Sequence, residues 1–237
     1  MTRDSTETVL QVSDTEKDLG VWVDNKLRFD LHAERTASKA SRLVGMIRRT
    51  YVYLDKRSMT TLYKSLCRPI LEFGNVIWHP QYQKDAVVVE NVQRRATKLI
   101  PGLRDMEYED RMRHLKLPSL AYRRDRGDMI EVYKRLNGHY KYPFTYLKLS
   151  SAPVRGHSQR LFKEHARHQC RRKFFSQRVV DIWNSLPEEV VTLPTLNQFK
   201  NKLDAHWEHY MYSQTSPSMR TQTQTRLASQ SKTSHRM

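Results

Sequence analysis

Adjacent carboxylates are the side chains of this sequence that come nearest to metal-dependent chemistry. Glu109 is followed by Asp110, and Glu188 by Glu189. Phosphoryl chemistry with two Mg²⁺ ions needs several carboxylates close together. Neighbouring residues of a helix point about 100° apart, and both pairs lie among helix-start signals, where acidic residues are common for structural reasons. We interpret both pairs as surface charges and expect neither a catalytic site nor a metal site.

Histidine and cysteine form a second candidate metal cluster. His157, His165, His168 and Cys170 are of the residue types that bind zinc. The cluster holds no second thiolate, and on a helix residues 165, 168 and 170 would not share one face. The sequence also has no glycine-rich phosphate loop and no HExxH motif. We therefore expect a basic surface with incidental histidines, and no cofactor.

Lysine and arginine are dense enough to suggest contacts with phosphates. Residues 155–178 carry eight bases and a single acid, Glu164, whereas residues 1–30 are net acidic. Two more basic clusters lie on expected helices whose other face is apolar. The candidate phosphate-binding residues are Arg94, Arg95, Lys98, Arg123, Arg124, Arg171, Arg172 and Lys173. An ordinary solvated face is the alternative for each cluster.

The elements that position these side chains begin with a short hairpin. Residues 19–23 alternate small and large apolar side chains, which predicts a strand, and Asp24-Asn25-Lys26 is a turn signal. From residue 31 the apolar period changes to three and four, behind Asp30 as a possible N-cap. The change predicts an amphipathic helix after the hairpin.

Helical periodicity continues over almost all of residues 31–138. Further helices are expected behind Asp55, over about 85–99, over about 108–115, and from Ser119 to about 136. Pro69 should kink or break the second of these helices. The fold class is therefore mainly α, with a short N-terminal β-hairpin, a helical bundle and a smaller basic helical unit.

Proline, glycine and serine mark a connector between residues 138 and 156, so we place a boundary near residue 150. Beyond it, two helices are expected, one ended by Pro187 and one that begins with a capping box of Thr195 and Gln198. The segment 211–237 is rich in Ser, Thr, Gln and Arg and is predicted to be disordered. The expected units are 1–30, 31–150, 151–210 and 211–237.

Composition limits the function classes. A net charge of +17 and a pI near 10.0 favour nucleic acid as a partner, although acidic proteins and anionic membranes would also be attracted. Two cysteines do not make a disulfide framework, and no apolar run reaches the length of a membrane span. We expect an intracellular protein of the nucleus or cytoplasm that has no membrane segment.

Blocks of sequence, in order, resemble one known family. The blocks are residues 17–21 (KDLGV), 63–74 (YKSLCRPILEFG), 78–80 (WHP), 93–98 (QRRATK), 108–111 (YEDR), 123–128 (RRDRGD), 174–176 (FFS) and 183–187 (WNSLP). Over roughly residues 9–207 the chain is similar to the region that follows the catalytic core in reverse transcriptases of jockey-like non-LTR (LINE) retrotransposons.

The resemblance implies a role for each segment. Leu19-Gly20-Val21 resembles the primer grip, residues 31–138 the thumb and its extension, and residues 155–207 the family's tail domain. The palm with its Mg²⁺-binding aspartates, the fingers and the endonuclease domain are expected to be missing, since Met1 comes only a few residues before the primer-grip match. Mg²⁺ is then expected only in the full-length family enzyme, and the missing palm and fingers are possible partners.

Three functional hypotheses follow. The first is a non-catalytic remnant of an RNA-directed DNA polymerase that binds RNA, an RNA–DNA hybrid or duplex DNA through phosphates, without reading sequence. The second is an incomplete copy of a full-length active reverse transcriptase. The third is a helical protein-interaction module.

Overall fold

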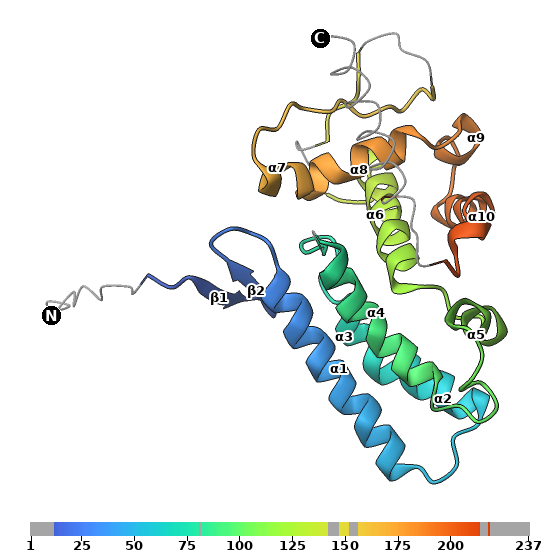
Figure 1. The fold of residues 1–237 in the computed structure, drawn as a ribbon. Helices are drawn as coiled ribbons and strands as arrows, with labels where there is room; N and C mark the ends of the chain where they lie inside the picture. The colour runs from blue at the N-terminus through green and yellow to red at the C-terminus, as the bar shows by residue number, and fades with distance from the viewer. Residues whose placement is uncertain (1–11, 81, 142–146, 152–155, 214–217, 219–237) are drawn as a thin grey trace, which may run out of the picture.

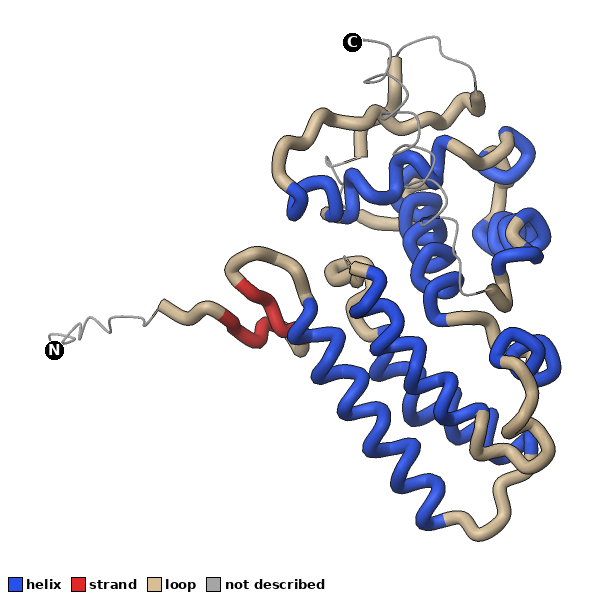
Figure 2. Tube along the Cα trace, in the orientation of Figure 1, coloured by secondary structure: helices blue, strands red, loops and turns tan. Residues whose placement is uncertain are grey.

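The computed structural model describes residues 12–80, 82–141, 147–151, 156–213 and 218. Within them the protein is mainly helical, with one antiparallel hairpin near its N-terminus, as the sequence predicts (Figure 2). The elements are β1 Thr15–Asp18, β2 Val21–Asp24, α1 Asp30–Thr50, α2 Lys56–Leu62, the π-helix η1 Tyr63–Cys67, α3 Arg68–Glu72, α4 Gln83–Thr97, α5 Tyr108–Leu115, α6 Leu120–Leu136, α7 Gln169–Lys173, α8 Phe175–Asn184, α9 Glu188–Val191, α10 Leu196–His206 and the 3₁₀-helix η2 Glu208–Tyr210.

Three rods of helix form the first unit. Figure 1 shows α1 and α4 running in the same direction, with the continuous rod of α2, η1 and α3 running back beside them. Ala33, Ala37 and Ala40 lie buried on one face of α1. Because alanine side chains are small, they let the neighbouring helices approach closely. The core of this unit extends from Val21 to Leu120.

Pro69 neither kinks the second rod sharply nor ends it. The π-helical turn Tyr63–Cys67 precedes it, and the backbone N–H of Arg68 donates to the carbonyl of Tyr63. Proline has no N–H to donate in the α-helical pattern. The wider π turn before it changes the hydrogen-bond pattern at this point, and the rod continues into α3. The expected kink or break is therefore a local change of helix type.

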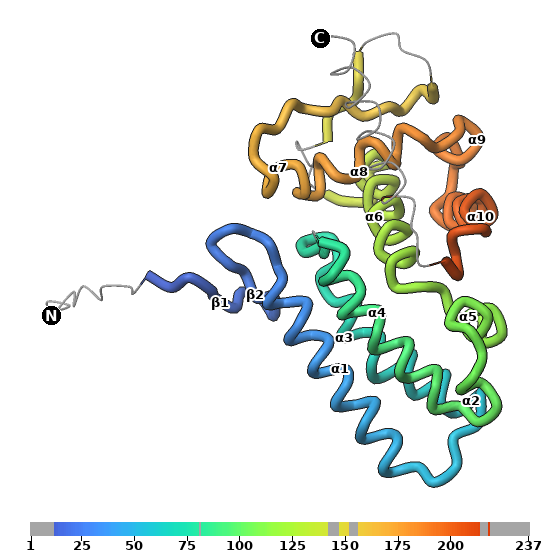
Figure 3. The backbone as a smooth tube through the Cα atoms, in the orientation of Figure 1, coloured from blue at the N-terminus to red at the C-terminus, as the bar shows by residue number. Residues whose placement is uncertain are grey.

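A second unit packs around α6. Its core joins Met129, Val132 and Tyr133 of α6 to residues of α8, α9 and α10, such as Val179, Trp183 and Phe199. Figure 3 shows α6 leading from the three-rod bundle into this unit. The two apolar clusters therefore divide at the start of α6, between Leu120 and Tyr122, whereas the boundary expected from the sequence lies near residue 150.

The predicted cap at Thr195 is confirmed, and the residues expected at two other helix starts, Asp55 and Ser119, are also N-caps. Asp55, Ser119 and Thr195 accept N–H groups from Ser58, Tyr122 and Gln198, at the starts of α2, α6 and α10. The cap predicted at Asp30 is displaced by one residue: Phe29, with a left-handed backbone, is the N-cap of α1, and Asp30 is the first residue of the helix.

The disorder predicted for residues 211–237 falls mostly outside the described residues. Of the described part, Met211 packs against the second core, and its carbonyl accepts the N–H of Ser119 at 2.9 Å. Met211 is therefore part of the folded unit, contrary to the prediction, because apolar burial and a backbone hydrogen bond both hold it.

Candidate nucleic-acid interface

Leu19 and Gly20 form the turn of the hairpin, whereas the sequence predicts them to lie in a strand. The register pairs Asp18 with Val21, which leaves these two residues between the strands. Their φ angles are 44° and 90°, the left-handed region that a two-residue hairpin turn of type I′ requires at both positions. A Cβ atom on Gly20 would lie 3.1 Å from Cε1 of Phe73. Leu19 is exposed and Val21 is buried.

Polar contacts fasten the hairpin to the start of α1. The carboxylate of Asp24 accepts the backbone N–H groups of Lys26, Arg28 and Phe29, each at 2.9 Å. Burial alone would raise the pKa of Asp24, but these three hydrogen bonds outweigh it, and the pKa is lowered. Next to them, the N–H of Trp22 donates to Nδ1 of the buried His32 at 3.1 Å. The orientation of α1 is therefore fixed relative to the hairpin.

The outer edge of β1 is blocked by its own side chains. The hydroxyl of Ser13 donates to the carbonyl of Thr15 at 2.7 Å and accepts its N–H at 3.4 Å. The carboxylate of Glu16 accepts the N–H of Lys17 at 3.3 Å. An open edge strand attracts further strands, and these contacts, together with the surrounding charges, make such pairing unfavourable.

An exposed basic stripe on α1 is the largest feature that the sequence analysis overlooked. Arg35, Lys39, Arg42 and Arg49 are exposed. At 100° per residue they fall within a narrow sector of the helix surface, and at 1.5 Å per residue they span about 21 Å. The spacing of four, three and seven residues is visible in the sequence and is the signal that predicts this stripe.

These four bases are not neutralised by acids. Within the described part of the chain, none of them forms an ion pair. The guanidinium of Arg35 lies 3.7 Å from the centre of the Trp22 ring, so the hairpin supports the first base of the stripe. The stripe therefore presents its positive charge to solvent.

A groove between α1 and α4 runs alongside this stripe. It has a volume of about 340 Å³, and Ser38 and Ser41 of α1 and Asn91 and Arg95 of α4 are among its lining residues. Lys98, one turn beyond Arg95, is also exposed. Of the predicted phosphate-binding residues on α4, Arg95 therefore lies in the groove.

Arg94 points elsewhere. Its guanidinium lies 4.6 Å from the centre of the Tyr108 ring, and it lines a small hollow with Gln83, Glu90 and Arg124. The basic cluster predicted on α4 is thus divided between two sides of the helix, as a 100° rotation per residue requires.

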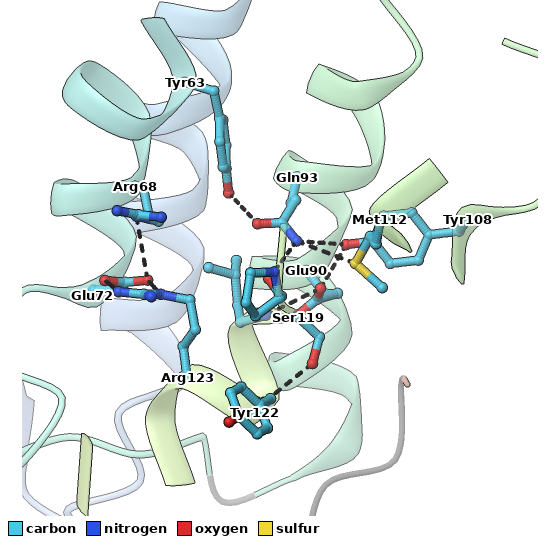
Figure 4. Close-up of polar contacts among 12 residues, drawn as sticks. Tyr63, Arg68, Glu72, Glu90, Gln93, Tyr108, Met112, Ser119, Tyr122 and Arg123 are labelled. Atoms are coloured by element: carbon cyan, nitrogen blue, oxygen red, sulfur yellow. Dashed lines mark hydrogen bonds and ion pairs between the residues drawn. The ribbon is translucent and has the colours of Figure 1, made fainter. Parts of the chain in front are cut away.

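Arg123 is partly buried and Arg124 is buried, whereas a face that contacts phosphates would be open to solvent. Two guanidinium nitrogens of Arg123, Nε and Nη2, donate to the carboxylate of Glu72 on α3, and the Nη2 contact measures 2.8 Å (Figure 4). Arg124 is only 3% exposed, and burial lowers the pKa of its guanidinium. Arg123 thus joins α6 to α3.

A buried polar network joins four elements at the same junction. The side-chain N–H₂ group of Gln93 lies 3.2 Å from the hydroxyl of Tyr108 and 3.1 Å from the carbonyl of Pro118, while its oxygen accepts the hydroxyl of Tyr63 at 2.8 Å (Figure 4). The carboxylate of Glu90 accepts the N–H of Leu120 at 3.0 Å. Since a carboxylate is favourable at a helix N-terminus, Glu90 helps to fix the direction of α6.

The basic stretch 155–178 is less positive in space than in sequence. Lys163 contacts Asp181, Arg171 lies 2.7 Å from Glu164, and Arg178 lies 2.8 Å from Asp128. Asp128 and Asp181 both lie outside residues 155–178, so a count of charges within that stretch does not include them. Arg172 is exposed, and its Nε donates to the carbonyl of Ala166 at 2.8 Å. Lys173 is partly exposed.

The candidate metal ligands are dispersed. His157 is buried, with Nε2 2.9 Å from the carbonyl oxygen of Trp183 and its ring edge-on to that indole. In the described ranges, no group of three or more His, Cys, Asp and Glu side chains is placed to hold a metal ion. None of the helices that the structure describes has both the length and the apolar character needed to cross a membrane.

Comparison with known proteins identifies no relative: no protein-family model, no curated protein and no solved structure matches the chain. The resemblance to the non-LTR reverse transcriptases therefore stays a prediction from the sequence blocks.

Proposed function

We propose that the chain binds nucleic acid through phosphate contacts, without reading base sequence, as the thumb-like and tail part of a non-LTR reverse transcriptase. The single observation that carries the proposal is the exposed stripe of Arg35, Lys39, Arg42 and Arg49 on α1. Four unneutralised bases along about 21 Å match a polyanion with regularly spaced charges. A duplex advances about 3.4 Å per base pair, so the stripe spans roughly six base pairs.

Recognition of this kind does not depend on base identity. The side chains of the stripe are long and flexible, and phosphate contacts position a protein on a nucleic acid without selecting a sequence. Arg95, which lines the groove together with Glu34, and the exposed Lys98 at the end of α4 add two bases to those of the stripe. Release of condensed counterions from the phosphates then supplies most of the affinity, so the affinity should fall steeply as the salt concentration rises.

The resemblance to the reverse transcriptases supports the same proposal. The stripe lies within residues 31–138, the part that resembles the thumb, and α1 is held by the hairpin that resembles the primer grip. Polymerisation itself is not proposed for this chain. The measurement is primer extension on an RNA template with Mg²⁺ and deoxynucleotides, for which we expect no product; template-dependent synthesis would overturn this part of the proposal.

The binding proposal is tested by a salt titration. Each phosphate contact contributes a slope of about −0.9 to a plot of log affinity against log salt on duplex DNA. Changing Lys39, Arg42 and Arg49 together to Gln should weaken binding to unrelated duplexes equally and flatten the slope by about two to three units. Arg35 is left in place because it also packs on Trp22.

A second triple variant with the same change in net charge is the control. Lys116, Lys134 and Lys200 lie at the end of α5 and on α6 and α10, away from the groove. Their replacement by Gln should change the slope by less than one unit. Equal effects of the two triple variants would show that total charge, and not the α1 stripe, determines binding.

A protein-interaction module remains the second candidate. Leu19 and Phe73 are large apolar side chains exposed at and beside the hairpin turn. Such exposure is unusual enough to suggest a protein contact. Affinity for nucleic acid separates the two: a parent protein that binds neither RNA nor duplex DNA at low salt would favour the protein-interaction module.

A further inference from the structure

Two phenylalanines are exposed on the most basic part of the second unit. Phe162 is 53% and Phe174 is 49% exposed. Aromatic side chains usually bury most of their surface, and the core of this unit takes up the neighbouring Leu161 and Phe175 instead. The two exposed rings therefore need an explanation other than packing.

Phe162 lies beside a lysine across a short β-bridge. Leu149 and Leu161 form the bridge, and the N–H of Phe162 donates to the carbonyl of Lys148 at 2.7 Å. Directly opposite residues of an antiparallel pair point to the same face, so the ring of Phe162 and the side chain of Lys148 are neighbours.

Phe174 lies beside an arginine. The guanidinium of Arg171 is 5.5 Å from the centre of its ring, within the range of a cation–π contact. Glu164 joins the two sites, because its carboxylate lies 3.2 Å from Nζ of Lys148 and 2.7 Å from Nη2 of Arg171. Glu164 thus forms ion pairs with the two bases that lie beside the rings, Lys148 and Arg171.

The segments around the two rings contain more bases than acids. Six bases and two acids leave four positive charges in excess; they are Lys148, Lys163, Arg167, Arg171, Arg172 and Lys173, with Glu164 and Asp181. Arg167 and Arg172 are exposed. The surface therefore combines flat apolar faces with a charge that attracts phosphates.

We propose that this surface binds single-stranded nucleic acid, with bases stacked on Phe162 and Phe174 and phosphates held by Arg167, Arg172 and Lys173. Bases of a duplex are already stacked on one another, whereas an open strand can place its bases on exposed rings, whatever the sequence. This inference rests on the proposed function and adds a second binding mode to it: the α1 stripe contacts phosphates alone, and the tail surface also contacts bases.

The test compares a short oligo-dT strand with an abasic strand of the same length, by fluorescence anisotropy. The variant replaces Phe162 and Phe174 with Leu, which keeps an apolar side chain and removes the aromatic face. Base stacking on an aromatic ring is worth about 1–3 kcal/mol by substitution. Because Leu keeps an apolar side chain, we take the lower end of this range, which is about fivefold for each ring. The double variant should bind oligo-dT roughly ten- to thirtyfold more weakly and bind the abasic strand as the parent does, with an unchanged salt slope.

Two controls separate the sources of an effect. Replacing Val52 and Ile77, which are also exposed, with Ala should leave the ratio of the two affinities unchanged. A variant with Tyr at both phenylalanine positions should restore the preference of the parent for oligo-dT. Because both original rings are exposed, the urea midpoint of the Leu variant should match that of the parent.

The outcomes distinguish this inference from the proposed function. A parent protein that binds neither strand nor a duplex overturns both. A parent protein that binds with a steep salt slope but equally to both strands, or a Leu variant that keeps the preference of the parent, overturns stacking alone. Loss of binding to anionic vesicles in the Leu variant, with oligo-dT binding unchanged, would assign the surface to membranes instead.

Discussion

Arg178 on α8 and Asp128 on α6 form a doubly hydrogen-bonded ion pair inside the protein. Nε and Nη2 of the arginine lie 2.8 and 3.0 Å from the two carboxylate oxygens, and the side chains are 9% and 2% exposed. Nη2 also donates to the carbonyls of Asn75 and Val76 in the loop before α4. The contact therefore ties the second unit to the first.

Loss of one partner should destabilise the fold strongly. Arg178→Gln leaves the buried carboxylate of Asp128 without its doubly hydrogen-bonded partner, and removal of one partner costs about 3–5 kcal/mol in buried pairs. Urea denaturation measures the loss. Arg172→Gln, an exposed change in the same stretch, should stay within about 0.5 kcal/mol. A loss below about 1 kcal/mol for Arg178→Gln would mean that the pair does not brace the two units.

Acid should weaken the attachment of the hairpin through His32. Burial lowers the pKa of His32 to about 4, so the folded state keeps this ring neutral and the unfolded chain binds a proton near pH 6.5. The stability that depends on the neutral ring is fully present above about pH 6.5 and is lost as the pH falls toward 4, at most about 3 kcal/mol.

The measurement is the free energy of unfolding at pH 7 and pH 5 for the parent and for His32→Asn. The Asn side-chain oxygen can accept the N–H of Trp22 in place of Nδ1 but does not titrate. The variant should lose less stability than the parent between the two pH values. Burial also lowers the pKa values of His79 and His157. The difference between the parent and the variant therefore measures the contribution of His32 alone. Identical losses would exclude His32 as the titrating group.

Gln93 should be needed for stability because its side chain is fully buried and bonded on both sides (Figure 4). Gln93→Leu leaves the hydroxyl of Tyr63 and the carbonyl of Pro118 without this partner. Each buried polar group so orphaned costs about 1–3 kcal/mol, and we expect a total of about 2–4 kcal/mol by urea denaturation.

Asn91→Leu is the matched control on the same helix, where the side chain is exposed; it should change stability by about 0.5 kcal/mol or less. If the two variants were equally stable, the polar network at the start of α6 would contribute nothing to the fold.

Bases of the tail should differ in their contribution to binding. Arg172→Gln with Lys173→Gln should flatten the salt slope on single strands by about one to one and a half units, at about 0.7 per contact. Arg171→Gln alone should change it by less than half a unit, because Glu164 already neutralises this charge. A larger effect of Arg171 than of the other two would show that it leaves Glu164 when nucleic acid binds.

Local patterns made the helices predictable, since three- and four-residue periodicity and the caps at Asp55, Ser119 and Thr195 act over a few residues. The turn at Leu19-Gly20 was missed because apolar alternation suggested a strand there. The left-handed backbone that a type I′ turn needs is signalled mainly by the glycine.

Contacts between distant residues could not be predicted. Arg123 meets Glu72 on another helix, and Arg178 meets Asp128 across the unit, so a charge count along the chain overstates the free bases. The apolar face of α6 gives no indication of which helices cover it. The α1 stripe, in contrast, could have been found from the sequence alone.

The position of α6 at the start of the second core has a consequence during synthesis. Its apolar face, with Met129, Val132 and Tyr133, is covered by α8 and α10, which leave the ribosome later. About seventy residues separate the end of α6 from Trp207, and they take roughly 4–14 s to make at 5–20 residues per second. During that interval α6 is a docking site for chaperones and for other nascent chains. The yield of folded protein should therefore fall when translation of residues 137–207 is slowed with rare codons, and the ratio of soluble to aggregated product measures it.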